Sequence, residues 1–192
     1  MTCKKSINNK KTRCSWCNTN NSNYVAYHDN EWGKLNTSDS YLFEMLLLET
    51  FQAGLSWECI LNKREAFRDA FDNFNVYKIA SYKSCKVLEL LNNKDIVRNK
   101  LKINSAITNA RIFINIKNEY KSFYNYLKTY SLGKIYYEQG KTSSELSDAI
   151  SKDLKKRGMK FVGTTIIYSY LQAIGIINSH EQKCFLYKIK QN

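Results

Sequence analysis

Apolar residues recur along most of this chain with the spacing of an α-helix. Ile103, Ile107, Ala110 and Ile114 follow one another at intervals of four, three and four residues, which places them on one face of a long helix. Comparable patterns predict helices over about 41–53, 56–71, 76–81, 85–91, 144–157 and 164–174. The alternation of apolar and polar residues that is typical of strands is scarce. The pattern therefore predicts an all-α fold.

Capping residues stand at several of the predicted helix ends. Ser38 or Thr37, Ser56 and Ser144 precede three of the helices, and a hydroxyl side chain suits the N-cap position. Gly54 follows the 41–53 helix, where the backbone of a helix end favours glycine. The next residue, Leu55, is either the hydrophobic contact of this helix end or a wedge that enters a stack of nucleobases.

Length and composition limit the class of protein. The chain has 192 residues, enough for one domain with a hydrophobic core, and 43% of them are hydrophobic, which excludes a disordered chain. It contains no proline, which excludes proline-rich and collagen-like proteins. No apolar run approaches the roughly 18 residues of a membrane span, and no apolar stretch follows the basic N-terminus. We therefore expect a cytoplasmic protein with a mobile basic tail over residues 1–12.

The positive charge of the chain indicates a polyanionic partner. Lys and Arg outnumber Asp and Glu by 30 to 17, which gives a net charge of +13. A basic domain most often binds nucleic acid, although AT-rich codons also favour lysine. Residues 95–103 join two predicted helices, and such a turn offers backbone N–H groups to a phosphate beside Arg98, Lys100 and Lys102. A second basic cluster, residues 155–160, is explained equally well as a solvated helix end.

Cysteine and histidine residues at both ends of the chain form a candidate metal site. Without a secretion signal, the six cysteines are free thiols, core residues or metal ligands rather than disulfides. Cys184 follows His180 by four residues, and Cys14 precedes His28 at a zinc-finger-like distance. Two Cys and two His are the ligands of a closed structural zinc site, while buried core residues are the alternative. The Cys14-x-x-Cys17 spacing leaves either cysteine as the fourth ligand.

Aromatic residues gather in the first third of the chain. They include all three tryptophans, and the set is Trp16, Tyr24, Tyr27, Trp32 and Trp57. Flat rings stack on nucleobases, and their negative faces bind cationic bases especially well. A plain aromatic core is the alternative explanation for any single ring. Together, the rings are candidates for a base-binding surface.

Glu49 is the most informative carboxylate of the sequence. It shares a face of the 41–53 helix with Leu42, Met45 and Leu46, and this face is otherwise apolar. A carboxylate is rarely buried without a partner, so Glu49 is either paired with a buried donor or positioned for a ligand. Burial would raise its pKa, and a cationic ligand would lower it.

Taken together, several blocks of the sequence resemble the 3-methyladenine DNA glycosylase I family, which belongs to the helix-hairpin-helix DNA glycosylases. The resemblance covers about residues 13–187, and the blocks 27–33 and 52–57 are the specific ones. The matching blocks include Arg13-Cys14-Ser15-Trp16, Tyr27-His28-Asp29-Asn30-Glu31-Trp32-Gly33, Gln52-Ala53-Gly54-Leu55-Ser56-Trp57, Val97-Arg98-Asn99 and Lys160-Phe161-Val162-Gly163-Thr164-Thr165. The resemblance implies the helix-hairpin-helix glycosylase fold over residues 13–192, with two helical subdomains that share one cleft.

The resemblance also implies roles for individual residues. Glu49 corresponds to the catalytic-pocket glutamate that accepts hydrogen bonds from the methylated adenine, and Leu55, after Gly54, corresponds to the wedge in the DNA. The base-binding aromatic residues correspond to Tyr24, Tyr27, Trp32 and Trp57. The DNA-binding hairpin and its neighbour correspond to Ile96, Val97, Arg98, Asn99 and Lys102. The ligands of the family's structural zinc, which joins the N- and C-terminal segments, correspond to Cys14, His28, His180 and Cys184.

The implied function is hydrolytic removal of 3-methyladenine from alkylated double-stranded DNA. Many relatives in the superfamily have an aspartate just after the hairpin, whereas this chain has Asn99, Asn104 and Asn109 and no acid before Glu119. We therefore expect a monofunctional glycosylase without a catalytic lysine, which acts as a monomer and has no membrane partner. The alternatives are a non-catalytic zinc-containing DNA-binding domain, an alkylpurine glycosylase of broader specificity and an RNA-binding module.

Three features depart from the family pattern. The tail before Arg13 has no counterpart at the usual start of the family, and Cys17 adds a competing metal ligand. Residues 128–142 carry little family signal, so no role is predicted for them.

Overall fold

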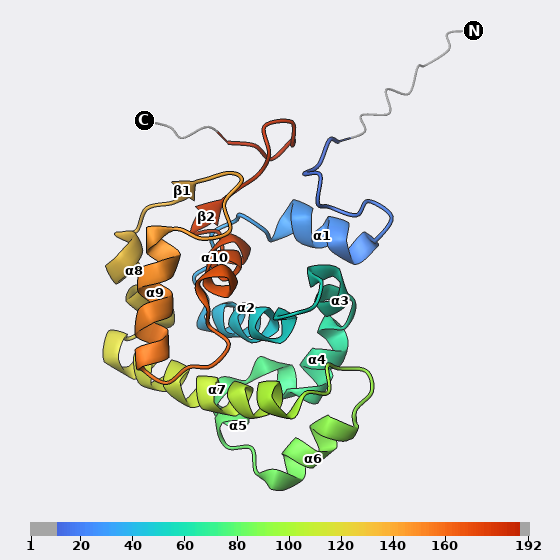
Figure 1. Ribbon diagram of the computed structural model, residues 1–192, viewed down its shortest axis with the longest axis vertical. Coiled ribbons are helices and arrows are strands. Elements are labelled where there is room, and N and C mark those ends of the chain that lie inside the picture. The colour runs from blue at the N-terminus through green and yellow to red at the C-terminus, as the bar shows by residue number, and fades with distance from the viewer. Residues whose placement is uncertain (1–10, 189–192) are drawn as a thin grey trace, which may run out of the picture.

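A computed structural model describes residues 11–188 of the chain. The predicted basic tail over residues 1–12 lies outside this range except for Lys11 and Thr12. The carbonyl of Thr12 accepts a hydrogen bond from the backbone N–H of Phe185 at 2.9 Å. The beginning and the end of the described chain therefore lie side by side (Figure 1).

Helices dominate the described residues (Figure 1). The elements in chain order are α1 (Ser22–Asn30), α2 (Asp39–Gln52), α3 (Trp57–Asn62), α4 (Arg64–Ala70), the 3-10 helix η1 (Asp72–Phe74), α5 (Val76–Ala80), α6 (Ser84–Asn92), α7 (Lys100–Tyr120), α8 (Phe123–Ser131), β1 (Tyr136–Tyr137), α9 (Glu145–Lys156), α10 (Thr164–Ala173) and β2 (Ile177–Asn178). The two strands form one short parallel pair. The prediction of a mainly helical fold is confirmed, and this pair is the only strand structure in residues 11–188.

Helix α2 forms the centre of the fold. It packs against α7, α8 and α10, and α3 lies beyond its C-terminal end (Figure 1). Leu42, Met45 and Leu46 are at most 1% exposed, so the predicted apolar face of this helix is confirmed. Phe51 on its last turn is fully buried as well. A polar side chain on the inner part of α2 is therefore held in a rigid and largely dry environment.

Three helices differ from the sequence-based expectation. The predicted helix over 56–71 is two helices, α3 and α4, because the backbone of Lys63 leaves helical geometry with φ −104° and ψ 1°. Helices α1 and α8 were not predicted, although Phe123, Tyr126 and Leu127 give α8 a buried apolar face at helical spacing. Within α1 only Tyr27 and His28 are buried, and the helix begins where the side chain of Asn21 accepts two backbone N–H groups. Ser56 and Ser144 do act as side-chain N-caps, as predicted, whereas Ser38 occupies the N-cap position without such a bond.

Gly175 ends α10 in a position where no other residue fits. Its backbone has φ +78°, and a Cβ atom there would lie 2.1 Å from the carbonyl carbon of Lys34 and 2.2 Å from the backbone nitrogen of Leu35. We expect Gly175→Ala to destabilise the protein by about 3 kcal/mol or more, because backbone atoms cannot move away cheaply. In thermal denaturation this corresponds to a fall in Tm of about 6–12 °C for a chain of this size.

Gly140 provides the matched control for that substitution. It also has positive φ, at +66°, but nothing lies within 4 Å of its added Cβ atom. Gly140→Ala is therefore expected to cost only the left-handed backbone penalty, about 1–2 kcal/mol. Equal losses of Tm in the two variants would show that the contact with the 34–35 backbone is unimportant.

None of the helices within residues 11–188 combines the length and the apolar character that crossing a membrane requires.

Candidate functional site

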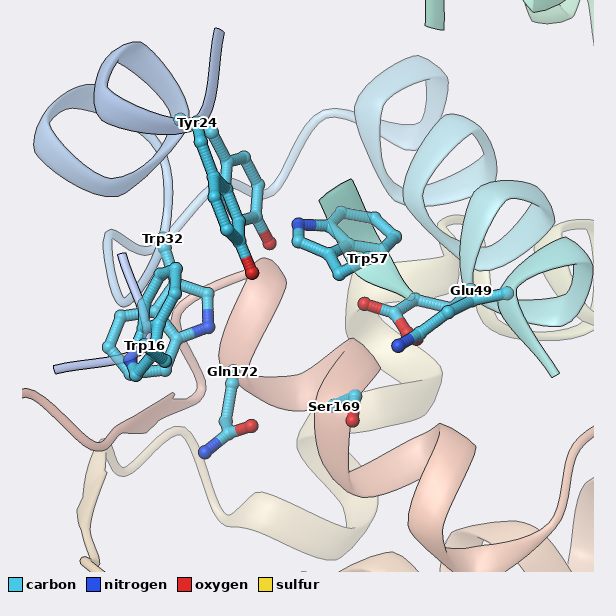
Figure 2. A pocket seen from close by; sticks show the side chains of 9 residues that line it. Trp16, Tyr24, Trp32, Glu49, Trp57, Ser169 and Gln172 are labelled. Atoms are coloured by element: carbon cyan, nitrogen blue, oxygen red, sulfur yellow. The ribbon is translucent and has the colours of Figure 1, made fainter. Parts of the chain in front are cut away.

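A pocket of about 240 Å³ opens among α1, α2, α3 and α10 (Figure 2). The residues that line it are Trp16, Tyr24, Tyr27, Trp32, Glu49, Gln52, Trp57, Ser169 and Gln172. The structure therefore brings Glu49 together with all four predicted base-binding aromatic residues. They come from three helices and from the turn that follows α1.

Aromatic rings form most of the wall of the pocket. The rings of Tyr27 and Trp57 lie with their centroids 5.3 Å apart, and Trp16 packs edge-on against Trp32 at 4.7 Å. Trp16 also contacts Tyr24 at 5.4 Å. Aromatic rings carry negative charge on their faces and positive charge on their edges. Such a wall favours a flat ligand that carries positive charge.

Glu49 supplies the carboxyl group of the pocket. The residue is 2% exposed, and its Oε2 atom has no hydrogen-bond partner among residues 11–188. Burial raises the pKa of this carboxyl group to about 8, which confirms the predicted direction. The indole N–H of Trp57, on the same side of the pocket in Figure 2, is also buried and without a partner in that range. The pocket thus holds two buried polar groups, the carboxyl of Glu49 and the indole N–H of Trp57, that a ligand can satisfy.

Three polar residues of the pocket were not predicted from the sequence. Gln52 lies one turn after Glu49 on α2, and Ser169 and Gln172 lie one turn apart on α10. The side-chain amide of Gln172 donates to the hydroxyl of Ser179 at 2.8 Å, which fixes its orientation. After Thr165 the other residues of α10 are aliphatic or aromatic, so two polar residues three positions apart were the available signal.

The predicted wedge lies directly after α2. Gly54 has φ +80°, a left-handed conformation that favours glycine, and the N–H of Leu55 donates to the carbonyl of Gln52 at 2.6 Å. Leu55 is 41% exposed, so its side chain is accessible to a partner. Because Gln52 lines the pocket, this exposed leucine stands close to the pocket mouth.

The predicted hairpin joins α6 to α7 over residues 93–99. Ile96 is buried and Val97 packs against the core, so their side chains anchor the turn. The backbone N–H groups of Ile96, Val97 and Arg98 donate to no acceptor within residues 11–188. The side chain of Asn99 caps α7 by accepting the N–H groups of Leu101 and Lys102 at 3.0 and 3.1 Å. The turn therefore presents free donors and an exposed Arg98 beside a helix N-terminus, which suits a phosphate.

The prediction that Lys102 contacts DNA is corrected by the structure. Lys102 is only 5% exposed, and its Nζ atom donates to the carbonyls of Phe51 at 2.7 Å and Ala53 at 2.6 Å. The position is explained by α7, whose first turn directs the side chain toward the C-terminal end of α2. Carbonyl groups at a helix C-terminus lack partners and attract a cation.

A cluster of four side chains lies at the junction of the N- and C-terminal segments. Cys14, His28, His180 and Cys184 are all buried, and one ligand atom from each lies within 4.8 Å of the others. The Nδ1 atom of His180 lies 3.4 Å from Sγ of Cys14 and 3.5 Å from Sγ of Cys184. Ligands that surround zinc at about 2.0–2.3 Å in a tetrahedron lie about 3.3–3.8 Å apart. The four residues therefore fit a zinc ion.

The surroundings of the cluster orient its histidines. The Nδ1 atom of His28 lies 2.8 Å from Asp29, whose carboxylate is also held by Arg13 at 2.7 Å. The Nε2 atom of His180 lies 3.2 Å from the backbone carbonyl of Trp32. Burial lowers the pKa of both histidines, and a neutral imidazole is the form that binds a metal. Partners of this kind commonly orient histidines around zinc.

Of the two candidate cysteines near the N-terminus, the structure places Cys14 in the cluster. The thiol of Cys17 faces the backbone carbonyl of Tyr24 at 3.9 Å and is not a member of the four-residue group.

Comparisons with known proteins agree with this geometry. The family model for methyladenine glycosylases matches residues 16–187. DNA-3-methyladenine glycosylase 1 of Escherichia coli is 41% identical over 181 residues, which cover 91% of this chain and 96% of that protein. A crystal structure of 3-methyladenine DNA glycosylase I superimposes with a TM-score of 0.88 at 42% identity and covers 92% of this chain and 100% of that one.

A solved structure from Staphylococcus aureus, described as the structural basis of 3-methyladenine recognition by this glycosylase, matches with a TM-score of 0.85. It is 33% identical and covers 91% of this chain and 95% of that one. The match extends over nearly the whole chain and includes every helix that lines the pocket. The chain therefore belongs to the methyladenine glycosylase family.

Proposed function

We propose that this chain excises 3-methyladenine from alkylated duplex DNA by hydrolysing the bond between base and sugar. The observation that carries the proposal is the buried carboxyl group of Glu49, unpartnered within the described residues, in a pocket walled by aromatic rings. The relatives named above are glycosylases for this base, which agrees with the chemistry of the pocket.

Recognition of the base follows from its charge. Methylation at N3 makes adenine cationic while it is still attached to the sugar. Ring faces such as those of Tyr27 and Trp57 attract a cation more than a neutral base. The cation lowers the raised pKa of Glu49, so the carboxylate forms and accepts charge-assisted hydrogen bonds. Neutral adenine lacks this charge and therefore binds less well.

The hairpin and the wedge present the damaged nucleotide to the pocket. The free backbone N–H groups of residues 96–98 hold a phosphate without reading sequence. Leu55 then fills the space from which the base has rotated. A damaged base costs less to extrude than a sound one, which adds selectivity before the pocket tests it.

The chemical step requires little from the protein. The base leaves easily because it already carries positive charge, and its departure leaves an oxocarbenium-like sugar that a nearby anion stabilises. Glu49 is such an anion once it is ionised. No lysine is among the residues that line the pocket, which supports a monofunctional enzyme. Asn109, one of the asparagines after the hairpin, bonds the backbone of Lys160 at 3.0 and 2.9 Å and has a structural role instead.

A zinc ion in the Cys14, His28, His180 and Cys184 cluster has a structural role in this proposal. Four protein ligands leave no open position for chemistry, so the ion supplies only a link between the chain ends. This link stabilises the pocket because two residues that line the pocket, Trp16 and Trp32, lie beside the histidine ligands. The ring of Trp16 lies 5.2 Å from that of His28, and the carbonyl of Trp32 contacts His180.

The domain organisation follows from the same site. The residues that line the pocket come from positions 16–57 and from Ser169 and Gln172 of the same chain. We therefore propose a single domain over residues 13–192 that acts as a monomer. Its two helical parts meet at the pocket, and we place the enzyme with the DNA in the cytoplasm.

Base release and strand cleavage test this proposal together. Methylated duplex DNA is incubated with zinc-loaded protein, the freed bases are identified by mass spectrometry, and strand breaks are followed on a gel. We expect 3-methyladenine to be released and strands to stay intact until alkali is added. Release of 7-methylguanine at a similar rate would favour the broader alkylpurine enzyme, and binding without release would favour the non-catalytic domain.

Asp95 gives a prediction that is specific to this hairpin. Its exposed carboxylate forms no bond within residues 11–188 and lies three residues from Arg98. A negative charge at a phosphate-binding turn repels DNA by about 1 kcal/mol or less at close range in water. We expect Asp95→Asn to tighten binding to undamaged duplex by up to about fivefold at low salt, with less effect as salt screens the charge. Fluorescence anisotropy over a salt series measures this.

Glu145→Gln is the control for that change, since Glu145 is an exposed acid on α9, away from the hairpin in Figure 1. An equal gain in both variants would assign the effect to net charge rather than to the hairpin.

A further inference from the structure

The side chain of Lys102 forms an internal link that the proposed function does not yet use. It crosses from the first turn of α7 to the last turn of α2, where its Nζ atom donates to the carbonyls of Phe51 and Ala53 at 2.7 and 2.6 Å. Within the described residues, the hydrogen-bond partners of this ammonium group are these two carbonyls and no carboxylate. Burial without an acidic partner lowers its pKa, which is unfavourable for a lysine that only fills space.

The carbonyls that Lys102 contacts belong to the segment that turns into the wedge. Ala53 is the C-cap of α2, and Gly54 and Leu55 follow it directly. The carbonyl of Gln52, between the two contacted carbonyls, accepts the N–H of Leu55 at 2.6 Å. All three carbonyls of residues 51–53 are therefore occupied, and the direction in which Leu55 leaves the helix is fixed. Without the lysine, the buried carbonyl of Phe51 and the partly buried carbonyl of Ala53 would both lose this partner.

The backbone of Lys102 is linked to the hairpin by a hydrogen bond. Its own backbone N–H is capped by the side chain of Asn99, the last residue of the turn. The turn that leads into α7 thus carries the backbone N–H groups of residues 96–98, and the first turn of α7 carries the ammonium group that holds the end of α2. One side chain connects the part of the protein that grips the DNA backbone with the part that enters the base stack.

We infer that Lys102 is a positioning residue for base extrusion: it fixes the Gly54–Leu55 wedge at a set place relative to the phosphate held by the hairpin. The inference rests on the proposed function. It distinguishes the effect of the wedge from the binding of the free base, whereas replacement of a purely structural lysine would weaken both. The wedge should lose its effect when Lys102 is replaced, whereas the pocket that binds the free base should not.

The test compares Lys102→Met, Leu55→Ala and the double variant. For Lys102→Met we expect single-turnover release of 3-methyladenine from duplex DNA to fall about tenfold or more, because a misplacement of about 1 Å can cost on the order of 100-fold. The dissociation constant for free 3-methyladenine, followed by tryptophan fluorescence, should change less than about twofold. In the Leu55→Ala background, Lys102→Met should have little further effect, since coupled residues are not additive.

Lys117→Met is the matched control. Lys117 lies on the same helix and pairs with Asp39 at 3.2 Å, so its replacement removes one charge and one partly exposed ion pair at the other end of α7. We expect its release rate to match that of the unmodified protein. Lys102→Arg, which retains a donor to carbonyl groups, should recover part of the rate lost in Lys102→Met.

Two outcomes would overturn the inference. Multiplicative effects of Lys102→Met and Leu55→Ala, or a parallel loss of affinity for the free base, would show that Lys102 only stabilises the fold. If the unmodified protein released no base, the proposed function would fail by itself. The fluorescence of 2-aminopurine beside an extruded nucleotide would still test Lys102, and an unchanged signal in Lys102→Met would reject its role.

Discussion

Replacing Glu49 by glutamine is expected to lower single-turnover release of 3-methyladenine about 10- to 100-fold, the loss that follows from removing charge-assisted hydrogen bonds worth about 1.5–3 kcal/mol. Glutamine keeps the shape of the side chain but has no negative charge for the cationic base or for the developing sugar cation. Binding to undamaged duplex should stay within about twofold, because the hairpin and the wedge are untouched. Quench-flow release and anisotropy on the same protein sample separate the two effects.

Glu58→Gln is the control for Glu49→Gln. Glu58 is a carboxylate on the neighbouring helix α3, but it bonds the amides of Asn18 and Asn21 at 2.8 Å and does not line the pocket. Its replacement should leave base release nearly unchanged. A comparable loss in both variants would show that the effect comes from removing any nearby negative charge rather than from Glu49 itself.

The pH dependence of kcat/KM gives an independent signature of Glu49. Burial raises the pKa of its carboxyl group to about 8 in the free protein, and kcat/KM reports ionisation in the free enzyme. We expect kcat/KM to rise by up to about tenfold per pH unit below pH 8 and to level off above it. The profile of Glu49→Gln should lack this rise.

The same ionisation affects stability with a definite sign. In the unfolded chain the carboxyl group has its ordinary pKa of 4.5, and in the folded protein the pKa is about 8. Between these values the unfolded chain is ionised and the folded protein is protonated, so unfolding releases a proton and stability falls as pH rises. Glu49→Gln removes this slope and should be at least as stable as the unmodified protein at pH 8. Loss of activity in this variant would then not reflect unfolding.

The second large effect concerns the metal cluster. We expect one zinc ion per chain by elemental analysis, and its loss in Cys184→Ala. Removal of the ion should destabilise the protein by about 3 kcal/mol or more, because metal binding to a preformed site contributes directly to folding. For this chain length the fall in Tm is about 6–12 °C. Affinity for free 3-methyladenine should fall as well, since Trp16 and Trp32 lie against the histidine ligands.

Cys17→Ala is the matched control for the metal prediction. Cys17 is a buried cysteine only three residues from Cys14, yet it lies outside the cluster. The variant should retain one zinc ion and a nearly unchanged Tm. Equal zinc loss in Cys17→Ala and Cys184→Ala would mean that the fourth ligand has been assigned wrongly.

Much of the fold was accessible from the sequence because buried helix faces leave a periodic signal. The stripe of Leu42, Met45, Leu46 and Glu49 predicted both a central helix and a buried carboxylate, and the structure confirms both. Helix α1 left no such signal, because it is polar and its tyrosines serve the pocket rather than a simple core.

The site was predicted less completely, for reasons that particular residues make plain. Residues that differ in type from their surroundings, such as the histidines and the aromatic group, are brought together by the structure as the sequence indicated, while their roles stay predictions. Ser169 and Gln172 were missed because two polar residues on a largely apolar helix do not show which part of the fold they face. Lys102 was misassigned because sequence shows that a lysine is near a hairpin, but not that its side chain turns inward to carbonyl groups of α2.

The most direct test of the enzyme assignment is the time course of base release from one preparation of methylated duplex, with the zinc-loaded protein and Glu49→Gln measured side by side by mass spectrometry. We predict that the unmodified protein releases 3-methyladenine and that the variant releases it about 10- to 100-fold more slowly while it still binds the duplex. No base release by the folded, zinc-loaded protein, or equal release by both, would contradict the proposed role of this pocket.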